Sequence, residues 1–323
     1  MMKVNRLLVF IMLFFTFSCE KYDNVLSKWH WLEADLYENR EMRLIHEVQF
    51  DKNNNLRQHQ SMCLYDNKAF CFNDGRDSYV FDINTNKEWQ TADMPQKCHH
   101  NNAQFLDVYY EAEDKYPLLL LSRGDYPPSQ NEFYIFRVVE NNDSIYFHKV
   151  KTIKNIILEA KNNGSWLADT QNQMLYMYTM SNGDWQVTKD NHFCIYAFEL
   201  PNLLDESDVT LKYEDVKSYW EYDYLIHQGG TFYNGYLFFN VQGLVSVGNN
   251  LLDSSFNVIA INSKTGEIDA VLPIDNSMET EGISIYNEKL YVSFKNGIPD
   301  QRPNDIVLRI NEYTLPSSIV NNQ

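Results

Sequence analysis

Three histidines and a glutamate occupy the same position in a sequence pattern, here called the phrase, that recurs along this chain. His59, His100 and His227 each stand at the opening of an apolar, strand-like run, and Glu281 stands at the opening of the last such run. Imidazole and carboxylate groups are ligands that zinc and iron accept. If the copies meet in space, these four residues could hold a divalent metal, and no other cofactor is indicated.

The phrase itself predicts the elements that would position these residues. Each copy has a polar opening, an apolar strand, an Asx-rich, Gly-rich or acidic turn, and a second apolar strand. Copies begin at 59, 100, 162, 227 and 280, and a third strand is expected at 79–83, 131–139, 192–200, 256–261 and 305–311. Asn234-Gly235 is the expected turn of the fourth copy, because both residues tolerate left-handed backbone. Asp82 and Asn262 begin matching exit turns that their side chains can cap.

Repetition of a three- to four-strand unit resembles the β-propeller class, and in particular its five-bladed members. The resemblance covers roughly residues 30–315 and rests on the repeated order of strands. It implies an all-β fold of five blades in a single domain over residues 30–323, with segment 40–51 as the outer strand that closes the ring. Six or seven narrower blades, or a pair of β-sandwiches, are the alternatives. Helical periodicity is confined to short stretches, chiefly 32–43 and 203–219.

In a propeller the first strand of each blade lines a central channel, so the resemblance implies that the openings gather around one rim. The expected ligand-binding residues are His59, Gln60, His100, Asn101, Asn163, His227, Gln228 and Glu281. The glycines that follow His227 and Glu281 fit a close approach of backbones there. The rim could bind a polar ligand, bind a metal through His59, His100, His227 and Glu281, or only hydrogen-bond water. The sequence leaves these interpretations open.

The leading functional interpretation is a binding or interaction module for a polar molecule, a glycan or an envelope partner protein. The chain has no Gly-x-Ser-x-Gly, His-Glu-x-x-His or phosphate-binding Gly-Lys-Ser motif. The alternative is an envelope hydrolase or lyase, with the three histidines as bases or metal ligands and Glu281 as the carboxylate. Aromatic residues that could stack on sugars are Trp166, Trp185, Trp220 and Tyr222.

Residues 1–18 resemble the signal peptide of bacterial lipoproteins. Lys3 and Arg6 precede the apolar run 7–15, which is too short to span a membrane, and Ser18 precedes Cys19. The resemblance implies cleavage before Cys19, lipidation of its thiol, and a tether over residues 19–29. The expected location is the outer membrane of a cell envelope, on its periplasmic or outer surface. A plain secretory peptide with an incidental Cys19 is the alternative.

The net charge of the chain restricts its partners. The chain has 27 Lys and Arg against 44 Asp and Glu, a net charge of −17, and loss of Lys3 and Arg6 with the leader makes it −19. Such a surface repels phosphate backbones and anionic headgroups, so no nucleic acid is expected, and the lipid would be the only membrane contact. We expect a monomer.

Two of the cysteines lie in apolar strands. Cys63 and Cys71 are therefore expected to be buried free thiols.

Overall fold

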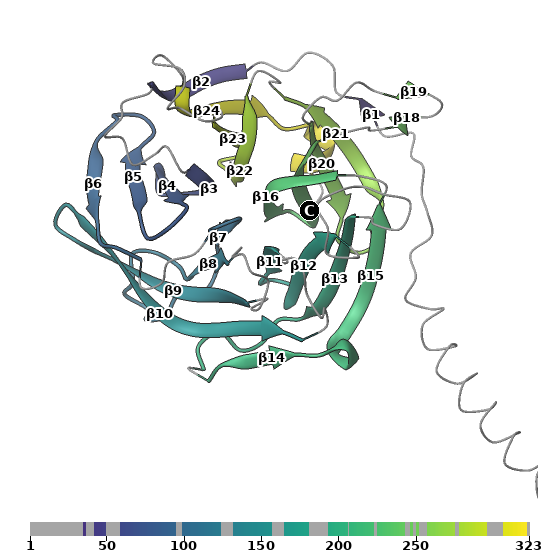
Figure 1. The fold of residues 1–323 in the computed structure, drawn as a ribbon, viewed down its shortest axis with the longest axis horizontal. Coiled ribbons are helices and arrows are strands. Elements are labelled where there is room, and N and C mark those ends of the chain that lie inside the picture. Colours follow the sequence, from purple (N-terminus) through teal and green to yellow (C-terminus); the bar gives the residue numbers. More distant parts are fainter. Residues whose placement is uncertain are drawn as a thin grey trace, which may run out of the picture.

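The computed structural model is described for part of the chain. The described residues are 35–36, 42–49, 59–94, 99–123, 132–156, 165–180, 193–205, 207–222, 225–242, 246–247, 250–251, 257–274, 278–295 and 306–321. Over these residues the fold is all-β, with several antiparallel sheets arranged around a central axis (Figure 1). The helical elements there are η2 (Tyr213–Asp215) and α2 (Ser317–Val320). No helix in the described ranges is long and apolar enough to cross a membrane.

Strand pairing runs outward from strands near the axis (Figure 1). A first group pairs in the order β3 (His59–Tyr65), β4 (Lys68–Asn73), β5 (Ser78–Asp82) and β6 (Glu88–Thr91). A second consists of β7 (Ala103–Phe105), β8 (Leu119–Ser122), β9 (Glu132–Asn141) and β10 (Ser144–Asn155), with β14 (Val209–Leu211) beside β10. Both belong to one nine-stranded sheet, because β6 pairs in parallel with β10.

The other groups repeat this arrangement. A third pairs in the order β11 (Ser165–Asp169), β12 (Met174–Met180), β13 (Phe193–Glu199) and β15 (Val216–Tyr222). A fourth has β16 (Leu225–Tyr233), β17 (Tyr236–Gln242), β20 (Asn257–Asn262), β21 (Ile268–Pro273) and β1 (Asp35–Leu36). A fifth has β22 (Glu279–Tyr286), β23 (Lys289–Lys295), β24 (Ile306–Thr314) and β2 (Met42–Gln49). β18 (Ser246–Val247) and β19 (Asn250–Leu251) form a separate hairpin.

We call β3, β7, β11, β16 and β22 the inner strands, because in the described part of the chain they lie nearest the axis (Figure 1). The predicted third strands are confirmed as β5, β9, β13, β20 and β24. The strand predicted within 40–51 is also confirmed, since β2 pairs antiparallel with β24. The N-terminal and C-terminal parts of the chain therefore share one sheet.

The expected turns are present, and they fix the register of the strands. Asn234 and Gly235 have φ values of 50° and 82°, a left-handed pair that joins β16 to β17. The Oδ1 atom of Asp82 accepts hydrogen bonds from the backbone N–H groups of Asn84 and Thr85 at 2.9 and 2.8 Å. In the matching turn, Oδ1 of Asn262 accepts from Lys264 N at 3.0 Å and from Thr265 N at 3.3 Å.

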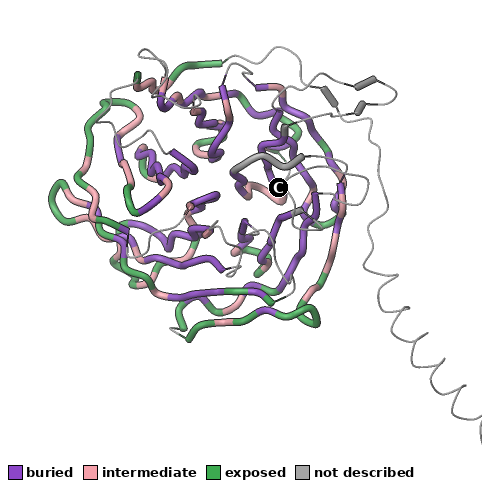
Figure 2. The backbone as a smooth tube through the Cα atoms, in the orientation of Figure 1, coloured by how far each residue is buried: buried purple, intermediate pink, exposed green. Residues whose placement is uncertain are grey.

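Apolar side chains fill the spaces between neighbouring groups of strands, while the outer strands carry most of the exposed positions (Figure 2). Phe193 of β13 packs against Phe239 of β17, with ring centroids 5.3 Å apart. Phe70 of β4 packs edge-on against Phe105 of β7 at 4.9 Å. Strands such as β4 are buried on both faces, which explains why they read as unbroken apolar runs.

The helical prediction for 203–219 is wrong. The structure places β14, the short helix η2 and the start of β15 in this stretch. Pairing of β15 with β13 and burial of Trp220 and Tyr222 in the core outweigh the weak helical pattern. In the other stretch, 32–43, the described residues belong to strands β1 and β2.

Candidate functional site

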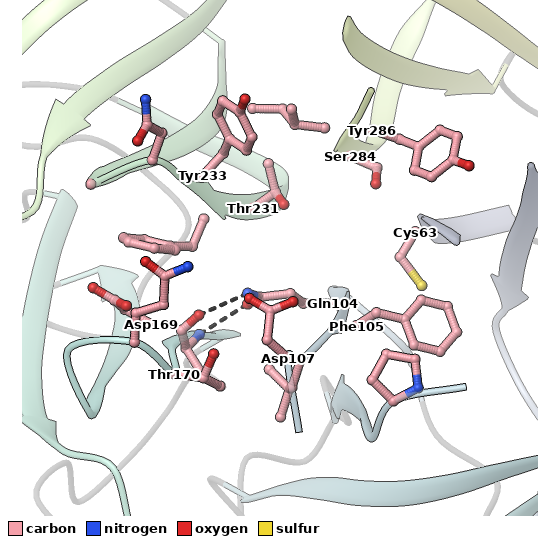
Figure 3. Close-up of a pocket in the computed structure, with 18 of the residues that line it drawn as sticks. Cys63, Gln104, Phe105, Asp107, Asp169, Thr170, Thr231, Tyr233, Ser284 and Tyr286 are labelled. Carbon is pink, nitrogen blue, oxygen red and sulfur yellow. Dashed lines mark hydrogen bonds between the residues drawn. The ribbon is translucent and has the colours of Figure 1, made fainter. Parts of the chain in front are cut away.

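A pocket of about 1030 Å³ lies at the C-terminal ends of the inner strands, beside the connections that follow them (Figure 3). Each inner strand contributes a residue near its C-terminal end, and these include Tyr65, Phe105, Asp169, Tyr233 and Tyr286. The volume is at the upper end of the range typical of ligand sites. Segments far apart in the sequence thus build one concave surface at the axis.

Three tyrosines occupy equivalent positions at this pocket. Tyr65, Tyr233 and Tyr286 are each the last residue paired before a two-residue turn, opposite Lys68, Tyr236 and Lys289. The turn residues Asp66-Asn67, Asn234-Gly235 and Asn287-Glu288 all have positive φ. This turn type fixes the register, so the three rings reach the same end of their strands.

The tyrosine hydroxyl groups differ in their partners. Tyr65 Oη lies 2.6 Å from Tyr109 Oη, and burial together with that contact raises the pKa of Tyr65 to about 12. Tyr286 Oη accepts a hydrogen bond from Asn67 N at 3.1 Å. The Tyr233 hydroxyl has no hydrogen-bond partner in the described residues, and burial raises its pKa. Tyr233 therefore keeps a polar group available to a ligand.

Three side chains with oxygen atoms point into the pocket. Two of them, Thr231 and Ser284, lie two residues before Tyr233 and Tyr286. Figure 3 shows the hydroxyl groups of Thr231 and Ser284 and the carboxylate of Asp107 directed toward its middle. Ser284 Oγ accepts a hydrogen bond from Leu64 N at 3.0 Å. Thr231 Oγ1 has no partner within the described ranges. Thr231 and Asp107 are thus free to bind a polar molecule.

The inner edges of the sheets are covered by side chains from neighbouring groups. Gln104 donates from Nε2 to Ala168 O at 2.8 Å and accepts from Ala168 N at 2.9 Å. Ser122 Oγ accepts from Trp166 N at 3.0 Å, and Asn102 Oδ1 accepts from Gly230 N at 2.8 Å. Backbone groups at a sheet edge need such partners when they are buried. The bonds tie the groups together around the axis.

The charge of the pocket is negative. Among its described lining residues the carboxylates are Asp107 and Asp169, and the cation is Lys264. Asp169 is buried and accepts hydrogen bonds from Asn172 N at 3.0 Å and Asn172 Nδ2 at 2.7 Å. Asp107 is exposed to solvent. The lining therefore disfavours anionic ligands.

The described residues of the predicted binding rim lie at, or just before, the opposite ends of the inner strands. His59, Gln60, His100, Asn101 and Glu281 are all buried there, with at most 5% of their surface exposed. Asn163 lies outside the described residues, as do the side chains of His227 and Gln228 in β16. None of the five described residues lines the pocket of Figure 3.

Two of these residues are brought together by Lys295. Its Nζ atom lies 2.6 Å from Glu281 Oε1 and donates to the backbone oxygen of His59 at 3.2 Å. His59 Nε2 lies 2.8 Å from Ser293 Oγ. Burial lowers the pKa of His59 to about 3, and the charge of Lys295 adds to this, so the imidazole is neutral. Burial raises the pKa of Glu281 to about 8, and Lys295 opposes the rise.

The same end of the inner strands carries β-bulges. The pairing register shifts between His59 and Ser61, between Ile226 and Gly230, and between Thr280 and Gly282. The expected close approach of glycine backbones is confirmed there. A Cβ atom on Gly229 would lie 2.6 Å from the backbone oxygen of Glu281, and one on Gly282 would lie 2.4 Å from Met62 N.

In the described part of the chain, no group of three or more His, Cys, Asp and Glu side chains is placed to hold a metal ion. The side chain of His227 is outside that part. The four-residue metal site therefore stays a prediction.

Sequence reasoning missed the pocket tyrosines, although a signal for them was present. Tyr-Asp-Asn, Tyr-Asn-Gly and Tyr-Asn-Glu occur at 65–67, 233–235 and 286–288, so each tyrosine precedes an expected turn. The aromatics considered for sugar stacking are placed elsewhere. Trp166, Trp220 and Tyr222 are buried in the core, and Trp185 lies outside the described residues.

Comparison with known proteins adds little. No protein-family model matches the chain, and no curated protein matches it. Among solved structures, the chain is similar to one described as a putative oxidoreductase (glucose dehydrogenase) from Thermus thermophilus. The TM-score is 0.48 and the identity 8%, over 85% of this chain and 100% of that one. A likeness at this level carries nothing about the reaction, cofactor or ligand of this chain.

Proposed function

We propose that this chain is a five-bladed β-propeller that acts as a binding module for a polar ligand. Support for the five blades comes from the five groups of strands in the described residues, each starting at an inner strand. Further support comes from the five apolar clusters, each between neighbouring groups, and from the pairing of β2 with β24. A propeller closes its ring through such a strand pair.

The observation that carries the binding role is the pocket at the turn ends of the inner strands. It combines aromatic faces, a hydroxyl group on Thr231 without a partner in the described residues, and the exposed carboxylate of Asp107. A largely preformed cavity with a few convergent polar groups is typical of ligand sites. The ligand of this proposal is a small polar molecule, a glycan or a short segment of a partner.

We place this module in the cell envelope, anchored by a lipid on Cys19. The proposal rests on the leader-like residues 1–18, which lie outside the described residues together with Cys19. The acidic surface gives no electrostatic attraction to anionic lipids, so the anchor would supply the membrane contact.

A thermal-shift screen with the full-length chain in detergent tests the binding role. The probes are neutral and anionic tetrasaccharides, tetraalanine and free amino acids. At ten times its Kd a ligand stabilises by about 1.4 kcal/mol, which is a Tm rise of roughly 2 °C for a chain of this size. The rise should disappear in Thr231→Val/Tyr233→Leu and persist in Tyr146→Ala, which changes an exposed tyrosine of β10. If no probe raises Tm, or if the double variant responds like the wild type, the proposal is wrong. Cleavage of a saccharide during the incubation would instead favour a hydrolase.

A further inference from the structure

We infer that the pocket takes a neutral oligosaccharide, an inference that rests on the binding role proposed above. Three features of the described residues lead to this class of ligand: the charge of the lining, the covered edges of the inner strands, and the pairing of aromatic faces with hydroxyl-binding groups.

The charge of the lining argues against anionic ligands. Among the described lining residues, the carboxylates of exposed Asp107 and buried Asp169 are accompanied by a single cation, Lys264, and the whole chain carries a net charge of −17. A phosphate or uronate group would be repelled by the exposed carboxylate of Asp107, and the described lining has no basic cluster to bind it. Neutral ligands avoid this electrostatic repulsion.

The hydrogen-bonded edges of the inner strands argue against an extended peptide as the ligand. A peptide strand that joins a sheet needs free backbone N–H and C=O groups at the edge of that sheet. At the pocket, Leu64 N is bonded to Ser284 Oγ, and both Ala168 N and Ala168 O are bonded to Gln104. A peptide added to β3 or β11 would have to break these hydrogen bonds.

The remaining groups match the chemistry of a sugar ring. A pyranose has hydroxyl groups at its rim and C–H bonds on its faces. The carboxylate of Asp107 can accept from hydroxyl groups, and Thr231 Oγ1 can both donate and accept. The negative faces of the Tyr65, Tyr233 and Tyr286 rings attract positively polarised C–H groups. Because these rings belong to three different inner strands, the surface suits several linked sugar units rather than one.

Calorimetric titration of the full-length chain with four probes tests this inference. Cellotetraose and maltotetraose are the neutral saccharides, tetragalacturonate is the anionic one, and tetraalanine is the peptide. At least one neutral probe should bind, and tetragalacturonate should bind at least about tenfold more weakly. Thr231→Val should weaken neutral binding roughly three- to tenfold through loss of one hydrogen bond. Asp107→Asn should reduce the ratio of the affinity for the neutral probe to the affinity for tetragalacturonate roughly fivefold. Asp143→Asn, at an exposed carboxylate outside the pocket, should change neither quantity.

The outcomes separate this inference from the binding role. If tetragalacturonate binds as tightly as the neutral probes, or if tetraalanine binds in the pocket and no saccharide does, the oligosaccharide inference is wrong and the binding role stands. If no probe binds at all, both fail. If a neutral probe binds equally well to wild type, Thr231→Val and Tyr233→Leu, its site is elsewhere and the inference is overturned. Tyr233→Phe, which keeps the ring, is the variant to use if Tyr233→Leu does not fold.

Discussion

Lys295 Nζ lies 2.6 Å from Oε1 of Glu281, whose carboxyl group is fully buried at the end of the inner strands opposite the pocket. Burial raises the pKa of Glu281 to about 8 against the opposing charge of Lys295. Burial and the same ammonium group lower the pKa of His59 to about 3. The two groups therefore make the stability of the fold depend on pH in opposite directions.

The free energy of unfolding should fall as the pH rises from about 6.5 to 8. Unfolded Glu281 loses its proton near its ordinary pKa of 4.5, whereas the folded protein keeps it up to about pH 8, so the stability it contributes is lost as pH rises toward 8. The contribution of His59 is lost instead as pH falls from 6.5 toward 3, so of these two only Glu281 acts above 6.5. The slope is at most about 1.4 kcal/mol per pH unit. Urea titrations across this range measure it, and an unchanged slope in Glu281→Gln would contradict the assignment.

Removal of Lys295 should cost more stability at pH 9 than at pH 6. At pH 6 the carboxyl group of Glu281 is protonated, whereas at pH 9 it ionises in the wild type and needs the ammonium partner. We expect the loss of stability in Lys295→Met to be larger at pH 9 than at pH 6 by up to about 1.4 kcal/mol, because without the ammonium group the buried carboxyl group keeps its proton above pH 8. In Glu281→Gln/Lys295→Met the difference between the two pH values should vanish. Equal losses at both pH values in the single variant would show that the pair is not coupled.

Gly229→Ala should destabilise the fold more than Gly235→Ala. The two glycines have nearly the same φ, 80° and 82°, so both variants pay a left-handed backbone cost of about 1–2 kcal/mol. A Cβ on Gly229 would also lie 2.6 Å from the backbone oxygen of Glu281, whereas one on Gly235 meets nothing within 4 Å. This steric overlap should add about 1–3 kcal/mol to the destabilisation caused by Gly229→Ala. Urea denaturation of both variants decides the point, and equal losses would argue against the close approach of β16 and β22.

The strands and turns could be predicted from the sequence because their signals are local. Asn234-Gly235 and the exit turns at Asp82 and Asn262 specify backbone conformations within four residues. The pairing of β2 with β24 followed from the repeat, although it joins residues more than 250 positions apart.

The candidate site was harder to predict, because the sequence does not show which end of an inner strand is open. Polar residues at the strand openings suggested a rim, yet the described ones among them are buried. The tyrosines were visible as Tyr-Asx pairs, but only the common register of their turns shows that they meet at one pocket.

Cys19→Ser should release the protein from membranes. The variant removes the thiol that would carry the lipid and leaves the apolar run 7–15 unchanged. Fractionation of cells in buffer without detergent measures the effect, with Cys98→Ser as the matched control. If the Cys19 variant sediments with membranes as the wild type does, lipidation at this position is refuted.

Blocking the pocket tests the central claim most directly. A cysteine introduced at Asn287, an exposed residue of the pocket lining, can be labelled with a bulky maleimide, and Asp143→Cys is the matched exposed control. The unsubstituted chain treated in the same way corrects for its own cysteines. If the pocket is the ligand site, labelling at position 287 abolishes cellotetraose or maltotetraose binding and labelling at position 143 leaves it intact. Full binding by the chain labelled at 287 would contradict the account.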